Sequence, residues 1–196
     1  MTEPPAGSAR ERILGAAEEL FADGGFDATP TSRIAERAGV PKGLVHYYFK
    51  RKPDLLEALV ERLPDERVGP EGVVVVGDVA ESLHRLVDAL DHLLGSSAVL
   101  SHLLWREADT HPAVLRVLGA RFEALVDQIR AVIVAAGPGG ATGADVDSAA
   151  QLLASAISYR HSIARHVVDG QAVMRRELHF LARALAAGAV APVASR

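Results

Sequence analysis

Basic side chains cluster in one short stretch of this 196-residue sequence, and their chemistry suits phosphate. Residues 28–52 hold six basic residues and one acid, Glu36, a local charge of +5 against −9 for the rest of a chain whose net charge is −4. The six are Arg33, Arg37, Lys42, Lys50, Arg51 and Lys52, which include every lysine of the chain. A solvated basic face would carry the same charge. A basic patch on an acidic chain is nevertheless typical of nucleic-acid binding, because phosphates need local cations and the acidic remainder limits nonspecific adhesion.

Small and apolar residues within this stretch have the spacing of a helix-turn-helix. Ala35, Gly39 and Val45 follow one another at intervals of four and six. Two helices joined by a tight turn cross closely, so the first needs a small residue at the crossing and the second needs an inward apolar anchor. The turn needs a residue that tolerates positive φ, as glycine does. The spacing therefore predicts helices over 31–38 and 42–48, with further apolar contacts from Ile34, Val40 and Phe49.

The outward face of the second predicted helix carries groups that can read base edges. Lys42 suits a guanine edge or a phosphate, Leu44 can touch a thymine methyl, and Gly43 allows a close backbone approach. Other side chains are candidates for the major groove or for phosphates on either side, although Tyr47 and Tyr48 could instead pack in a core. The candidate DNA-binding residues are Thr31, Lys42, Gly43, Leu44, His46, Tyr47, Tyr48 and Lys52.

Helical periodicity extends over the whole chain, so the sequence predicts an all-α fold. Ser8 and Glu11 have the spacing of a capping box at the start of a helix over 8–23, and Thr29 before Pro30 has that of an N-cap. The other predicted helices cover 53–63, 78–95, 98–109, 112–136, 144–168 and 171–187. Glycine and proline between 64 and 78 mark a boundary. The expected division is a DNA-binding domain at 1–52 with an arm at 1–7, a connecting helix and linker at 53–77, and a helical ligand-binding and dimerisation domain at 78–196.

Composition excludes several kinds of protein. The chain has no cysteine, which removes disulfides and thiolate metal sites, and its eight histidines lack metal-site spacing. No apolar run is long enough to span a membrane and the N-terminus lacks a signal core, so we expect a cytoplasmic protein with no cofactor. Gly-rich phosphate loops and nucleophile motifs are absent, and a surface ion pair explains Glu107 and His111 better than acid–base chemistry. An enzyme is not expected.

The C-terminal helices suggest a partner surface and a small-molecule pocket. The helices over 144–168 and 171–187 are apolar on more than one face, which predicts a homodimer through them, with burial inside one monomer as the alternative. Polar or aromatic residues embedded in apolar stretches are candidates for a mainly apolar pocket, although each could be a core residue. These ligand-binding candidates are His102, Trp105, Phe122, Ser155 and Tyr159.

The N-terminal residues resemble the TetR family of transcription regulators. The resemblance is nearly continuous over 10–63 and is carried by Gly24-Gly25-Phe26, by the run from Ile34 to Val40, and by the run from Lys42 to Lys52. It implies an all-helical homodimer with phosphate contacts from Thr31, Tyr48 and Lys52. The family usually has a small polar residue where this chain has Leu44 and a tyrosine where it has His46, so base preference does not transfer.

Together these observations predict a ligand-responsive transcriptional regulator. We expect a repressor that a small, mainly hydrophobic or aromatic molecule releases from a palindromic operator, with the helix over 53–63 as the lever between the two parts. The alternative is a DNA-binding transcription factor or scaffold that has no small-molecule sensor.

Overall fold

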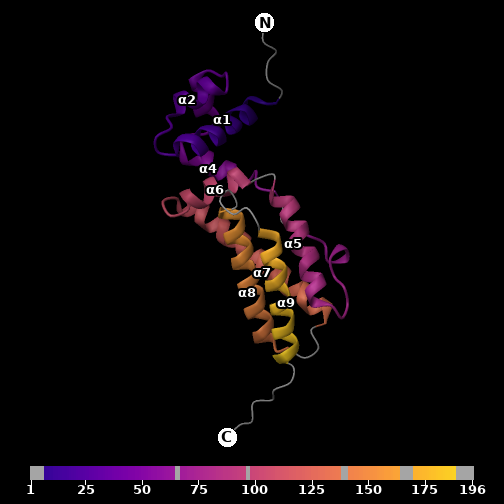
Figure 1. Cartoon of the computed structure of the whole chain (residues 1–196). Helices are drawn as coiled ribbons and strands as arrows, with labels where there is room; N and C mark the ends of the chain where they lie inside the picture. Colours follow the sequence, from indigo (N-terminus) through magenta and orange to yellow (C-terminus); the bar gives the residue numbers. More distant parts are fainter. Residues whose placement is uncertain (1–6, 65–66, 96–97, 138–140, 164–169, 189–196) are drawn as a thin grey trace. The chain divides into compact units, whose positions relative to one another are not determined.

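The computed structural model describes residues 7–64, 67–95, 98–137, 141–163 and 170–188 (Figure 1). These residues form nine α-helices, one short 3-10 helix at Pro70–Gly72 and no strand, which confirms the predicted all-α class. The helices are α1 (Ala9–Gly24), α2 (Thr31–Arg37), α3 (Lys42–Tyr48), α4 (Pro53–Val60), α5 (Val79–Gly95), α6 (Ala98–Glu107), α7 (Pro112–Ala136), α8 (Gly143–Ile163) and α9 (Gly170–Gly188). Within these described ranges, no helix is both long and apolar enough to cross a membrane.

Contacts divide the chain into two compact units that do not follow chain order. The first unit is Met1–Leu63 with Val99–Leu118, and the second is Pro64–Ala98 with Gly119–Arg196. This division differs from the boundaries expected at 52 and 77, because α4 and most of α6 belong with the N-terminal helices. The physical reason is a shared apolar core, to which α1, α4 and α6 contribute Ile13, Phe21, Leu55, Leu56, Leu59, Leu103 and Leu104.

Helix α1 ends as its sequence predicts, whereas α2 begins differently. The backbone N–H of Gly25, at φ 82°, donates to the carbonyl of Phe21, and the ring of Phe26 packs edge-on against Phe21 at 5.1 Å. The predicted Thr29 N-cap is wrong, because α2 begins at Thr31 with no side-chain cap. The Thr29 hydroxyl is buried and instead donates toward the carbonyls of Gly25 (2.8 Å) and Leu20 (3.2 Å), satisfying groups at the end of α1.

The second unit is built on α5, α8 and α9, which contact one another in every pairing. Figure 1 shows α8 and α9 running side by side. A reciprocal cap starts α8: the Asp145 N–H donates to the Thr142 hydroxyl at 3.2 Å, and the Thr142 N–H donates to the Asp145 carboxylate at 3.1 Å. The core of this unit includes Leu83, Leu86, Leu90, Ile129, Ile133, Leu153, Ile157 and Leu178.

Candidate nucleic-acid interface

Helices α2 and α3 form the helix-turn-helix that the spacing predicts. Ala35 is 3 % exposed and Val45 is fully buried, as the crossing of two close helices requires. Gly39 lies in the turn at φ 63°, a conformation that L-residues with a side chain adopt only at a cost. The Val40 N–H donates to the carbonyl of Ala35 at 3.0 Å, which fastens the turn to the end of α2.

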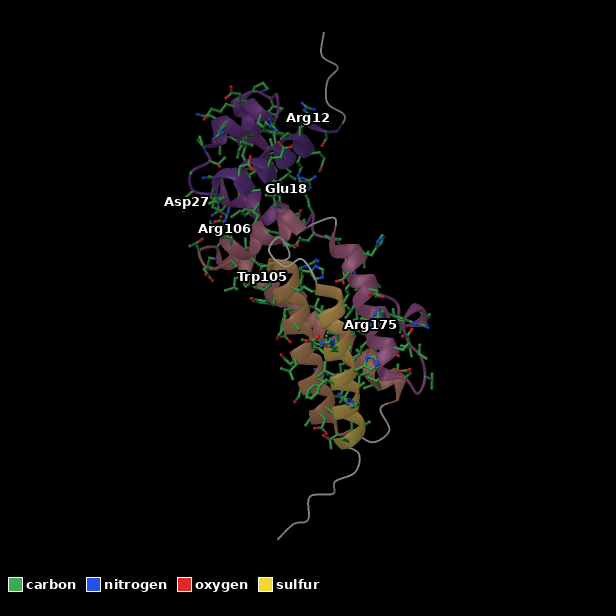
Figure 2. All side chains as sticks on the ribbon, in the orientation of Figure 1. Arg12, Glu18, Asp27, Trp105, Arg106 and Arg175 are labelled. Atoms are coloured by element: carbon green, nitrogen blue, oxygen red, sulfur yellow. The ribbon has the colours of Figure 1, made fainter. Side chains whose placement is uncertain are left out.

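Arg12 on α1 holds this turn and was not singled out by the sequence (Figure 2). Its Nε donates to the carbonyl of Ala38 at 3.3 Å, one residue before Gly39. A second N–H, on Nη1, donates to the carbonyl of Gly7 at 3.1 Å. No local signal distinguishes Arg12 from other polar residues on its helix face, because its partner lies 26 residues away in the chain. Arg12 is therefore a positioning residue for the turn.

The outward face of α3 is open to solvent. Lys42, Gly43 and His46 are exposed and Leu44 is half-buried. Tyr47 is 76 % exposed and Tyr48 40 % exposed, so neither ring is a core residue. Their rings meet edge-on with centroids 5.2 Å apart. Thr31, at the start of α2, is half-buried.

Gly43 is not required by the fold. A Cβ built at this position would meet nothing within 4 Å, and its φ is not in the left-handed region. Glycine inside a helix costs stability relative to alanine, so its presence on an exposed helix calls for a reason outside the monomer. Close approach of another molecule's backbone to α3 would supply that reason.

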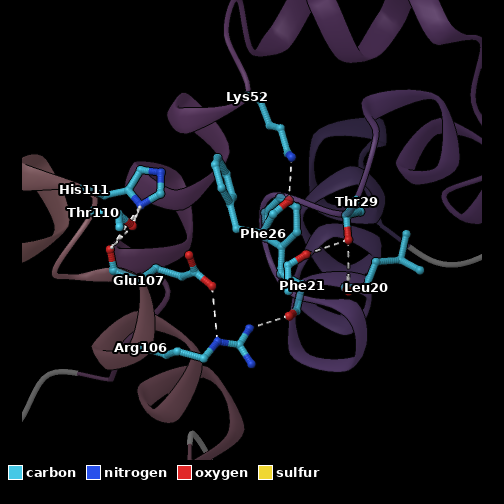
Figure 3. Close-up of polar contacts among 10 residues, drawn as sticks. Leu20, Phe21, Phe26, Thr29, Lys52, Arg106, Glu107, Thr110 and His111 are labelled. Carbon is cyan, nitrogen blue, oxygen red and sulfur yellow. Dashed lines mark hydrogen bonds and ion pairs between the residues drawn. The ribbon is translucent and has the colours of Figure 1, made fainter.

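Lys52 is turned toward its own domain (Figure 3). Its amine donates to the carbonyls of Phe26 at 2.5 Å and Asp27 at 3.2 Å, and it lies 4.3 Å from the centroid of the Phe26 ring. Burial lowers the pKa of the Lys52 amine, against the opposing attraction of Asp27 and Glu107. The expected phosphate ligand therefore has most of its donor capacity engaged within the first unit.

The end of α6 also contacts the N-terminal helices. Arg106 donates from Nη2 to the carbonyl of Phe21 at 2.8 Å and from Nε to the Glu107 carboxylate at 3.2 Å (Figure 3). The expected surface ion pair between Glu107 and His111 is wrong. Glu107 is 9 % exposed, and the His111 ring packs edge-on against Phe26 at 4.5 Å while its Nδ1 lies 3.0 Å from the Glu107 carbonyl.

Comparison with known proteins identifies this region. Residues 13–59 match the family model of bacterial regulatory proteins of the tetR family. The HTH-type transcriptional repressor BepR of Brucella suis is 33 % identical over 69 residues, which cover 34 % of this chain and 33 % of BepR. Residues 13–59 are therefore those of a tetR-family regulatory region.

Other transcriptional regulators extend the similarity beyond the helix-turn-helix. The HTH-type transcriptional activator FasR of Mycolicibacterium smegmatis is 28 % identical over 128 residues, which cover 64 % of this chain and 58 % of FasR. The chain is therefore aligned with about a third to three fifths of these two relatives. A solved transcriptional regulator from Rhodococcus sp. Rha1 has the same fold, with TM-score 0.66 at 21 % identity over 94 % of this chain and all of that one. The relatives are transcriptional regulators and not enzymes, as the sequence predicted.

The four ligand-binding candidates with described side chains do not gather within one unit. Trp105 is 38 % exposed in the first unit (Figure 2), whereas Phe122 packs partly buried against the core of the second. Ser155 and Tyr159 lie on the exposed face of α8, where the Ser155 hydroxyl donates to the Gln151 carbonyl at 2.9 Å and Tyr159 is 65 % exposed. The side chain of His102 lies outside the described part of the structure. Among the described residues, no three histidine or carboxylate side chains converge as a metal site.

Proposed function

We propose that the protein represses transcription by binding operator DNA through α3. The observation that carries this proposal is the exposed face of α3 on a helix-turn-helix whose inward residues Ala35 and Val45 are buried. Lys42, His46 and Tyr47 face the base edges of the major groove, and Leu44 reaches a thymine methyl. Thr31 and Tyr48 contact phosphates, and the surrounding cations add affinity that does not depend on sequence. Lys52, by contrast, we assign to the interior contacts of the first unit.

The functional molecule in this proposal is a homodimer joined through α8 and α9. Large apolar side chains lie in the open on both helices: Leu152 is 63 % exposed and Phe180 is 64 % exposed. Tyr159 continues the α8 face two turns beyond Leu152. Such a face is costly to leave in water, and a twofold partner would cover it with the same residues. Two recognition helices in one dimer then reach successive major grooves about 34 Å apart and read a palindrome.

The second unit acts in this proposal as a small-molecule sensor that sets the affinity for DNA. A ligand shifts the dimer toward an arrangement that fits the operator poorly, provided that it binds the two arrangements with different affinities. A cavity among the helices of this unit supports a sensor over a scaffold with no ligand, and its chemistry is considered below. Operator release on ligand binding distinguishes the two.

The decisive experiment replaces Lys42 and Tyr47 together. We expect Lys42→Ala with Tyr47→Ala to lower affinity for a palindromic duplex from the DNA upstream of the protein's own gene by about 100-fold, because two groove contacts are lost. The slope of log affinity against log salt should shrink by about one for the lost cation. Fluorescence anisotropy at several salt concentrations measures both. Arg116→Ala on α7, which removes one exposed cation outside both the basic stretch and the proposed dimer face, is the control. Unchanged affinity and slope in the double variant would refute the proposal.

A further inference from the structure

A cavity of about 400 Å³ lies among α5, α8 and α9, away from the residues expected to bind a ligand. Its apolar part is formed by Val87, Met174 and Leu178, all of them buried. Polar walls come from α5 and α8, and Arg175 contributes from α9 (Figure 2). The volume falls within the range of small-molecule sites, about 300–1,000 Å³.

A half-buried ion cluster forms one wall of this cavity. The Asp91 carboxylate on α5 accepts hydrogen bonds from Arg160 and from His161 (3.0 Å) on α8. Burial raises the pKa of Asp91, but the hydrogen bonds from His161 and Arg160 outweigh burial and leave that pKa below its ordinary value. Asp91 therefore remains a carboxylate, and its negative charge is already paired with Arg160 and His161 on α8.

Hydrogen-bond donors without an acceptor line the cavity. The Nε of Arg160 is buried and has no acceptor in the described structure. A buried donor left without an acceptor is costly, and such groups are rare in native proteins. The second acid, Asp88, has its carboxylate 3.3 Å from Nδ1 of His84. Arg175 and His92 line the same cavity, and within the described residues neither side chain is hydrogen-bonded or ion-paired.

We propose that this cavity binds a small carboxylate-bearing molecule with an apolar body, held by Arg175 and His92 at the carboxylate and by Met174 and Leu178 along the body. The unpartnered donors favour a ligand with acceptors, and a guanidinium pairs with a carboxylate through two parallel hydrogen bonds. The inference rests on the proposed sensor role of the second unit. It replaces the mainly apolar or aromatic molecule that the sequence suggested with an amphipathic anion.

The cavity and the proposed dimer face lie on different sides of α9. The cavity takes Met174, Arg175 and Leu178. Phe180, on the proposed dimer face, is five residues after Arg175, which turns it about 140° around a helix. A ligand in the cavity and a partner subunit can therefore bind to the same helix together.

The test compares head groups on one carbon skeleton. Calorimetric titration of the full chain uses octanoate, octylamine and octan-1-ol, and then phenylacetate and 2-phenylethylamine. We expect saturable binding of the carboxylates at one site per chain, and binding of the amines and the alcohol at least about tenfold weaker, because a charge-assisted pair is lost. Arg175→Gln should weaken octanoate binding about tenfold, whereas Arg176→Gln, which removes the neighbouring exposed charge, should leave it unchanged.

Three results would overturn the inference: no saturable binding of either carboxylate, amines binding as tightly as carboxylates, or equal effects of Arg175→Gln and Arg176→Gln. Operator affinity of the ligand-free protein is measured in parallel. If the protein binds its operator but no carboxylate, the inference fails while the proposed regulation of transcription stands. If it binds no operator, the proposed function fails whatever the titration shows.

Discussion

The two units differ in where their polar side chains point. In the first unit most of the candidate DNA contacts lie on α3 and face outward, and within the described structure the side chains of Lys42 and His46 form no hydrogen bond or ion pair. In the second unit a half-buried charge pair joins two helices, Asp91 on α5 and Arg160 on α8, 69 residues apart. An exposed side chain with no internal partner can bind another molecule, whereas a charge pair between two helices mainly stabilises the fold.

This difference separates the expected effects of substitution. Exposed groups on α3 should change DNA affinity with little effect on stability, since surface substitutions seldom exceed about 0.5 kcal/mol. Paired groups inside the second unit should change stability, because removing one partner leaves the other buried and unsatisfied.

The largest expected effect comes from Phe180, an exposed side chain of the second unit. It would show that this unit also depends on an outward-facing side chain. Phe180→Arg should place a charge in the proposed dimer face and produce a monomer, measured by sedimentation. Operator affinity should then fall by at least about 100-fold, because the second half-site no longer adds to the first.

Val134→Arg is the matched control for this experiment, since Val134 on α7 is 61 % exposed, nearly as much as Phe180, and lies outside the proposed interface. A Phe180→Arg protein that remains dimeric would place the partner surface elsewhere.

Sequence alone predicts the first unit better than the second, for a physical reason. A helix-turn-helix is formed by residues close together in the sequence, and Ala35, Gly39 and Val45 identify it within eleven residues. The outward face of its second helix then follows from the helical period. The cavity in the second unit is assembled from α5, α8 and α9, so no short stretch reports it. Trp105 and Tyr159 looked like pocket residues because they interrupt apolar runs, yet such interruptions also mark exposed faces.

The next largest expected effect tests the pairing of Asp91 with Arg160. Asp91→Asn should lower the free energy of unfolding by about 2 kcal/mol at pH 7, because hydrogen bonds to a charged acceptor are weakened. The folded-state pKa of Asp91 is lowered, so its contribution is complete above its unfolded pKa of about 3.9 and is lost as the pH falls through the folded value. Urea unfolding should therefore separate wild type from Asp91→Asn at pH 7 and bring them together in stronger acid.

Asp147→Asn is the control for Asp91→Asn, because Asp147 pairs with Arg130 at 2.6 Å while remaining 57 % exposed. Exposed pairs contribute about 0–1 kcal/mol, so this variant should lose less stability than Asp91→Asn at neutral pH. Equal losses would contradict the distinction between inward and outward charges.

Two glycines of the helix-turn-helix allow effects on stability and effects on DNA affinity to be compared within a single motif. Gly39→Ala forces a side chain into positive φ and should cost about 1–2 kcal/mol of stability. Gly43→Ala should leave stability unchanged or raise it by up to about 1 kcal/mol, because its Cβ enters open space and alanine favours helix. Operator affinity should nevertheless fall in Gly43→Ala if DNA approaches the backbone of α3. Thermal unfolding and anisotropy separate the two effects, and unaltered affinity would show that no close approach occurs there.

The smallest expected effect concerns Lys52, a cation in the basic stretch that behaves as an inward group. Lys52→Met removes two hydrogen bonds to carbonyls and should cost about 1 kcal/mol of stability. Because the amine is held over Phe26, the salt dependence of operator binding should stay the same, whereas Lys42→Met should reduce its slope by about one. A slope reduced equally in both variants would mean that Lys52 leaves Phe26 for a phosphate on binding DNA. Comparing the two lysines therefore distinguishes a charge that stabilises the fold from a charge that binds DNA. Their shared position in one basic cluster of the sequence does not make this distinction.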